Sequence, residues 1–133
     1  MKIVLDTNVL ISATFHGGVP LEVVKAARQG VVTVCVTAEI IAEYHAILLR
    51  FFGPGSEPDV AVVLNGLLMN AMVVAPMALP NPVAADPDDD KFIACALAAG
   101  ADFIVSGDKH LLGLHGRIPI PVLRPRDALA RIP

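Results

Sequence analysis

The stretch that decides the fold is residues 86–108, DPDDDKFIACALAAGADFIVSGD. It begins with four carboxylates in five residues, continues as an apolar helix, and ends in a short apolar strand followed by another acid, Asp108. Asp86 suits a helix N-cap, Pro87 suits the first helical position, and Gly100 suits the end of the helix. Because capping and the helix dipole account for only two or three of these acids, the density of the cluster indicates a further role.

Helical spacing separates the acids of this cluster. Asp89 precedes the apolar residues Phe92 and Ile93 by three and four positions, so it lies in line with the buried face, one turn nearer the helix start. Asp90 lines up with Ile93 in the same way and is the second candidate. Asp108 follows a strand predicted over residues 103–106, and open α/β sheets place their sites at the carboxyl ends of strands.

Length and composition limit the class of protein. A chain of 133 residues is expected to form one domain, residues 1–133, with a core of its own. Although 55% of the residues are hydrophobic, no apolar run approaches the roughly 20 residues of a membrane span, and no leader is visible. We therefore expect a cytoplasmic protein with no membrane partner. Cys35 and Cys95 have neither metal-type spacing nor a disulfide pattern and are expected to be reduced core residues.

Strand-type and helix-type segments alternate along the chain. Strands are predicted over residues 3–5, 31–36, 72–75, 103–106 and 120–123, with helices over residues 9–15, 20–28, 38–52, 59–70, 86–100, 109–112 and 125–132. This alternation predicts a doubly wound, mainly parallel sheet of about five strands in a three-layer α/β/α sandwich. Pro121 favours an edge position for the last strand. No regular structure is expected from Pro76 to Pro87.

Four separate segments each offer one carboxylate. Asp6 follows the first strand, Glu43 borders the apolar face of the helix over residues 38–52, and Asp89 and Asp108 lie in the stretch quoted above. Hard divalent cations prefer such oxygen ligands, and a bound ion can activate water and hold a phosphodiester. Since no lysine or arginine is evident among these acids, they would repel one another without a cation. With a net charge of −3, the chain would also need local basic groups or metal ions to bind a polyanion.

Four motifs together resemble the PIN-domain nucleases, in the right order and over nearly the whole chain. They are LDTNVLI at residues 5–11, TAEIIAE at 37–43, DPDDDKF at 86–92 and IVSGD at 104–108. The branch that looks most similar is the VapC-like toxins of bacterial toxin–antitoxin systems. The resemblance implies a parallel sheet flanked by helices, metal-dependent endoribonuclease activity on RNA, a homodimer and an antitoxin partner.

The resemblance also assigns roles to residues. Asp6, Glu43, Asp89 and Asp108 take the acidic positions of the family, which implies that they are catalytic and hold Mg²⁺ or Mn²⁺. Asn8 and Ser106 match supporting polar positions, and Ser106 stands where the family commonly has threonine. Asp86 and Asp90 flank the third acid, so the register there is open by one residue, with Asp89 favoured by its alignment with the apolar stripe.

Other interpretations of the same residues stay open at this point. Asp6 is also compatible with a strand-end cap and Asp108 with a turn. A receiver-type signalling domain would need an acidic pair after the first strand and a lysine near Val122, and neither is present. An aspartyl phosphatase would need an acid where Asn8 stands. A PIN-like module that only binds RNA or protein is the third alternative. The basic residues Lys91, Lys109, Arg117, Arg124 and Arg126 are each expected to be solvated, with phosphate contacts as the alternative.

Overall fold

The computed structural model describes residues 1–79, 82–84 and 86–133. Its centre is a five-stranded sheet with the order β3-β2-β1-β4-β5, in which every neighbouring pair is parallel. The strands are β1 (Lys2–Leu5), β2 (Thr33–Val36), β3 (Met72–Val73), β4 (Phe103–Val105) and β5 (Val122–Leu123). The prediction of a parallel sheet of about five strands is confirmed, and Pro121 directly precedes an edge strand as expected.

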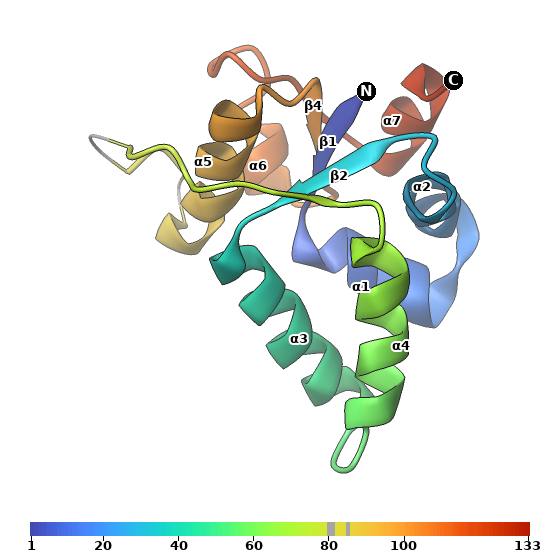
Figure 1. Cartoon of the computed structure of the whole chain (residues 1–133). Coiled ribbons are helices and arrows are strands. Elements are labelled where there is room, and N and C mark those ends of the chain that lie inside the picture. Colours follow the sequence, from blue (N-terminus) through green and yellow to red (C-terminus); the bar gives the residue numbers. More distant parts are fainter. Residues whose placement is uncertain (80–81, 85) are drawn as a thin grey trace.

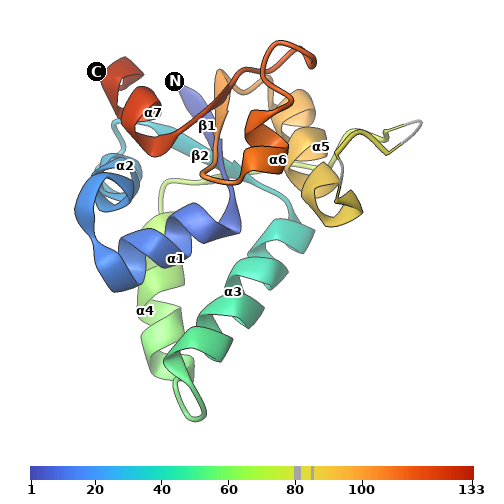
Figure 2. The same ribbon diagram turned by 180° about the vertical axis from the view of Figure 1, so that it is seen from behind.

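Helices cover both faces of this sheet (Figures 1 and 2). Helices α5 and α6 lie on one face, and α1, α2 and α7 lie on the other, so the predicted three-layer α/β/α sandwich is confirmed. Helices α3 and α4 pack against each other and extend away from the sheet (Figure 1). The helical segments are α1 (Thr7–His16), α2 (Gly18–Arg28), α3 (Ala38–Phe52), α4 (Glu57–Leu68), the 3-10 turn η1 (Pro87–Asp89), α5 (Asp90–Ala99), α6 (Lys109–Leu112) and α7 (Pro125–Arg131).

The helix ends follow the capping chemistry of the sequence. The Thr37 hydroxyl accepts a hydrogen bond from the backbone N–H of Ile40 at 3.2 Å. The Asp86 carboxylate accepts one from the N–H of Asp88 at 3.0 Å, and Gly100 ends α5 in the left-handed conformation with a φ of 63°. The acidic stretch differs from expectation in one respect, because it enters α5 through the 3-10 turn η1. Such tight turns are common at helix N-termini, and the short Asp86 cap stabilises this one.

The segment between β3 and η1 has no regular structure in its described residues, as expected, while Pro80, Asn81 and Ala85 lie outside the described part of the chain. Strand β3 is two residues shorter than predicted, and α4 begins two residues earlier. Helix α4 begins earlier because Pro58 occupies its first turn, where a missing N–H costs nothing.

The core lies between the sheet and the two helical layers. Its largest fully buried side chains include Tyr44, Phe92 and Phe103. Cys35 and Cys95 are buried and unbonded to each other, as the sequence predicts. Among the described residues, no helix combines the length and the apolar character needed to span a bilayer.

Candidate active site

The candidate site lies at the carboxyl ends of β1 and β4. From β1 the chain passes to β2 and then β3 on one side, whereas β4 and β5 lie on the other side of β1. The chain therefore changes direction across the sheet between the neighbouring strands β1 and β4. This is the topological switch point, where open α/β folds place their sites. Leu5 pairs with Val105 at the end of this ladder, and the N–H of Asp6 donates to the Val105 carbonyl at 2.9 Å. The two loops that carry Asp6 and Asp108 consequently start side by side.

Ser106 connects these two acids. Its hydroxyl is fully buried and donates to the Asp6 carboxylate at 2.8 Å. The same hydroxyl oxygen accepts a hydrogen bond from the backbone N–H of Asp108 at 3.0 Å. Asp6 is itself only 5% exposed and makes no capping hydrogen bond with α1, although it occupies the N-cap position. Its carboxylate is thus directed toward β4, which argues against a role as a simple helix cap.

The carboxyl groups of Asp6, Asp89 and Asp108 interact electrostatically. Burial raises the pKa of Asp6; the hydrogen bond from Ser106 lowers it in part, and the negative charges of Asp108 and Glu43 raise it again. The pKa of Asp89 is raised from 3.8 to about 6, first by burial and then by the charges of Asp6 and Asp108. Asp89 makes no capping hydrogen bond either. Asp108 interacts electrostatically with Asp89 and also caps α6, because its side chain accepts a hydrogen bond from the backbone N–H of His110 at 3.1 Å.

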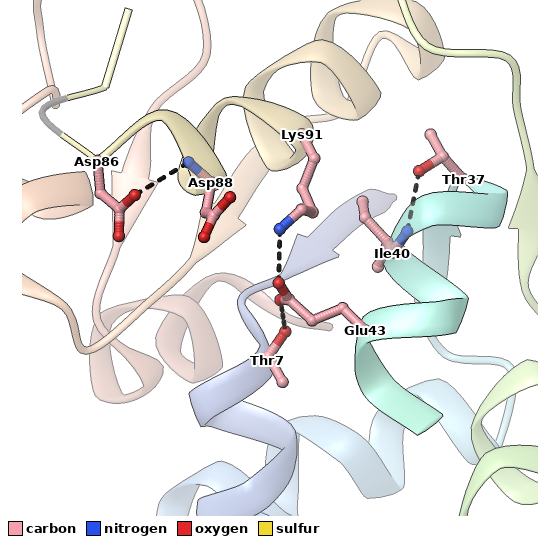
Figure 3. Close-up of polar contacts among 7 residues, drawn as sticks. All are labelled: Thr7, Thr37, Ile40, Glu43, Asp86, Asp88 and Lys91. Atoms are coloured by element: carbon pink, nitrogen blue, oxygen red, sulfur yellow. Dashed lines mark hydrogen bonds and ion pairs between the residues drawn. The ribbon is translucent and has the colours of Figure 1, made fainter. Parts of the chain in front are cut away.

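The two acids that flank Asp89 are engaged with the backbone. Asp90 accepts hydrogen bonds from the N–H groups of Ala84 at 2.6 Å and Val83 at 3.1 Å, so it anchors the segment that leads into the cluster. Asp86 caps the 3-10 turn through the N–H of Asp88 (Figure 3). Asp89, the acid favoured by the sequence, interacts electrostatically with Asp6 and Asp108, whose charges help to raise its pKa.

Glu43 lies on α3 and is held by two side chains from other elements (Figure 3). The Lys91 ammonium contacts one carboxylate oxygen at 2.5 Å, and the Thr7 hydroxyl donates a hydrogen bond to the other. The Lys91 side chain is only 8% exposed. Burial by itself would lower the pKa of Lys91, but the hydrogen bond and charge of Glu43 raise it above its usual value.

The expectations that no cation lies among the acids and that Lys91 is solvated are therefore wrong. Lys91 precedes the buried residues Ala94 and Cys95 by three and four positions, so the spacing argument that selected Asp89 also places Lys91 on a buried face. Thr7, which is 5% exposed, was also missed. Its sequence signals are its position directly after Asp6 and its place in the LDTNVLI motif.

Tyr44 is a further polar group beside the site. Its ring is fully buried, and its hydroxyl donates to the carbonyl oxygen of Leu5 at 2.5 Å. Burial raises the pKa of this phenol well above its usual value, and the nearby Asp6 carboxylate adds to the effect. The phenol therefore remains a neutral donor that fixes the last carbonyl of β1, next to Asp6.

The donor set fits a hard divalent cation. Within residues 1–79, 82–84 and 86–133, no three His, Cys, Asp or Glu side chains converge as a ready-made ligand group. Mg²⁺, however, usually keeps several waters and binds through one or two carboxylates, so it does not need a closed protein shell. Burial is the main reason why the pKa values of Asp6 and Asp89 are raised, and the charges of neighbouring acids add to it, so a bound cation would favour the ionised form of both. Asp6, Asp89 and Asp108 are the residues that would hold it.

The sequence matches the PIN domain family over residues 2–110, which is most of the chain. The chain belongs to the PIN-domain family. PIN domains are generally nucleases and generally need divalent metals. Membership in this family leaves the receiver and aspartyl-phosphatase alternatives without support.

A solved structure shows the same fold. The structure of VapBC2 from Rickettsia felis, bound to a DNA fragment from its promoter, superimposes with a TM-score of 0.65 over 93% of this chain and 98% of that one. At 14% sequence identity this similarity concerns the fold of the PIN domain alone. The sequence has no significant match among curated proteins.

Proposed function

We propose that this PIN domain is a divalent-metal-dependent endoribonuclease that hydrolyses RNA phosphodiester bonds. The observation that carries the proposal is that the carboxyl groups of Asp6, Asp89 and Asp108 lie near enough to interact electrostatically at the switch point of the sheet. These acids come from three segments, and the charges of Asp6 and Asp108 help to raise the pKa of Asp89 to about 6. Among the described residues no lysine or arginine forms an ion pair with these three carboxylates, and a divalent cation would offset their mutual repulsion.

In this proposal Asp6, Asp89 and Asp108 hold Mg²⁺ or Mn²⁺, directly or through water. A bound ion of this kind supplies Lewis-acid charge to the phosphodiester and lowers the pKa of water. Ser106 keeps the Asp6 carboxylate oriented and ties it to the backbone of Asp108. Tyr44 fixes the peptide that precedes Asp6.

Glu43 has a different environment and, we propose, a different role. The ammonium of Lys91 already balances its charge, and Thr7 fixes its second oxygen. This pairing favours a role in orienting the attacking water over direct ligation of the ion, because the carboxylate is already bound on both oxygens. Asn8 is exposed at the start of α1 and lines one cleft together with Asp108, and we propose that it supports the site from there.

We further propose that the chain is the toxin of a toxin–antitoxin pair, acting in the cytoplasm as a homodimer with an antitoxin protein as partner. The similarity of its fold to VapBC2, whose structure was determined on promoter DNA, supports this part of the proposal. A PIN-like module that only binds RNA or protein is the competing function.

The test is cleavage of a panel of cellular RNAs by the wild-type chain and by Asp6→Asn, each with Mn²⁺, with Mg²⁺ and with EDTA. We expect cut products from the wild type only when metal is present, and none from Asp6→Asn. Asp59→Asn, which alters an exposed acid in the first turn of α4, is the matched control and should cleave normally. Undiminished cleavage by a folded Asp6→Asn would refute the site, and inactivity of the folded, metal-loaded wild type on every RNA would favour the binding module.

A further inference from the structure

A cleft of about 340 Å³ lies directly beside the acidic site. It is formed by the first two turns of α1, the first turns of α2 and α7, and the loop after β4, to which Gly107 belongs. Its lining includes Asn8, Val9, Ser12, Pro20, Asp108 and Pro125. Asp108 therefore belongs both to the cleft and to the carboxylate cluster. The volume falls in the range of pockets that bind small organic ligands, about 300–1,000 Å³.

The lining determines which part of an RNA chain this cleft suits. Asp108 is its one charged residue among those that the structure describes, and no lysine or arginine lines it. A phosphate group would therefore be repelled from the cleft. Val9, Pro20 and Pro125 offer apolar surface of the kind that contacts the faces of a flat ring, so the cleft suits a neutral, partly apolar group.

Polar recognition comes from one face of α1. Asn8 and Ser12 are four residues apart, so their side chains project from the same side of the helix. Among the hydrogen bonds of the described residues, none engages the Asn8 amide or the Ser12 hydroxyl, whereas Thr14 on the same helix bonds to the Leu10 carbonyl. Both groups are thus available to a ligand. An asparagine amide can pair with a base edge through two hydrogen bonds, donating one and accepting the other.

We propose that this cleft binds the nucleoside that adjoins the scissile phosphate and so determines which base is accepted at the cut. The proposal rests on the proposed nuclease function and adds to it the part of the substrate that is recognised. A nucleoside seated in the cleft contacts Asp108, and its phosphate then falls at the carboxylate cluster. Asn8 and Ser12 would bind polar groups of the base or ribose, with the apolar residues against the faces of the base.

The test uses free nucleosides, which contain no phosphate and need no metal. Adenosine, guanosine, cytidine and uridine are titrated separately into the full chain, and the backbone amide signals are followed by NMR. We expect at least one nucleoside to shift the amides of Val9, Ser12 and Gly107. Ser12→Leu, which places a larger side chain in the cleft, should abolish these shifts. Ala46→Leu adds the same bulk to a separate cleft beside Gly53 and Pro54 and should bind as the wild type does.

Cleavage gives the second readout. We expect Ser12→Leu to raise KM for RNA by about tenfold or more, equivalent to about 1.4 kcal/mol, with little change in kcat or in Mn²⁺ affinity. Asn8→Ala, at an exposed position that should not affect folding, should relax the base preference at the cut sites. If no nucleoside shifts these amides, or if both variants keep the wild-type cut sites and KM, the proposal is overturned. Nucleoside binding by a chain that cleaves no RNA would overturn the nuclease function and leave the cleft assignment standing.

Discussion

Replacing Asp89 with asparagine should stabilise the metal-free protein. Its carboxyl has a pKa raised from 3.8 to about 6, so the folded chain disfavours the charged form. A shift of that size corresponds to about 3 kcal/mol at full strength. Because Asp89 is only half-buried, solvent screening reduces the effect to about 1 kcal/mol. Asparagine has nearly the same shape and no charge, so the variant removes this penalty.

The raised pKa of Asp89 also determines how the stability of the fold changes with pH. An acid whose pKa is higher in the folded state binds more protons when folded, so it destabilises the fold as pH rises. The penalty is absent below the unfolded value of 3.8, grows up to about pH 6, and is complete above that. We therefore expect Asp89→Asn to unfold about 4 °C higher than the wild type at about pH 8 in EDTA, and at nearly the same temperature at about pH 4.

Thermal and urea unfolding followed by circular dichroism between these pH values measure the effect. Asp88→Asn is the matched control, because Asp88 lies in the same turn and loses the same helix-dipole interaction, but is exposed. It should be neutral or slightly destabilising. The reasoning is refuted if Asp89→Asn is no more stable than Asp88→Asn at about pH 8, or if its advantage does not shrink in acid.

Three further predictions concern the same cluster. Lys91→Met should destabilise the fold by about 1–3 kcal/mol in urea unfolding, because it leaves Glu43 charged and half-buried. Adding Glu43→Gln should recover part of this loss. Strictly additive effects of the two substitutions would contradict the pairing. Ser106→Ala should lower the free energy of unfolding by about 1.5–3 kcal/mol, because the buried Asp6 carboxylate loses its hydroxyl donor. For the same reason it should raise the pKa of Asp6 further, as measured by NMR titration of the Asp6 carboxyl carbon. An unchanged pKa would contradict this prediction. The affinity for Mn²⁺, measured by electron paramagnetic resonance, should fall as the pH is lowered through about 6, because Asp89 takes up a proton there. An affinity that does not change between about pH 5 and 7 would count against Asp89 as a ligand.

Much of the fold could be predicted because the local signals agree with one another. Strand β1 is a short apolar run that is buried at Ile3, Val4 and Leu5, as a central parallel strand requires. The signals for the helix ends are local in the sequence. The Thr37 and Asp86 side chains bond to backbone N–H groups three and two positions away, and Gly100 directly follows the last residue of α5. Asp6 and Asp108 could be expected at one edge because parallel strands end on the same side of a sheet.

The contacts of the site across the fold could not be predicted in the same way. Lys91 pairs with a residue 48 positions away, and that contact depends on how α5 and α3 approach each other. The Thr7 and Tyr44 hydroxyls likewise bond across 36 and 39 positions. Spacing shows which face of a helix is buried, but it does not show what lies opposite that face. The residue type of Lys91 therefore predicts a surface charge, although its spacing from Ala94 and Cys95 places it on a buried face.

The pairing of Lys91 with Glu43 changes the electrostatics of the whole cluster. When all are ionised, four carboxylates and one ammonium leave a net charge of about −3, and with Glu43 paired to Lys91 that charge lies on Asp6, Asp89 and Asp108. An RNA phosphate approaching this edge without a metal ion would meet repulsion from all three acids. A divalent cation held by these three acids would turn this repulsion into attraction, and Glu43, whose charge Lys91 balances, would not be needed for that. The salt bridge thus separates Glu43, whose charge Lys91 balances, from Asp6, Asp89 and Asp108, which pair with no lysine or arginine in the described part of the chain.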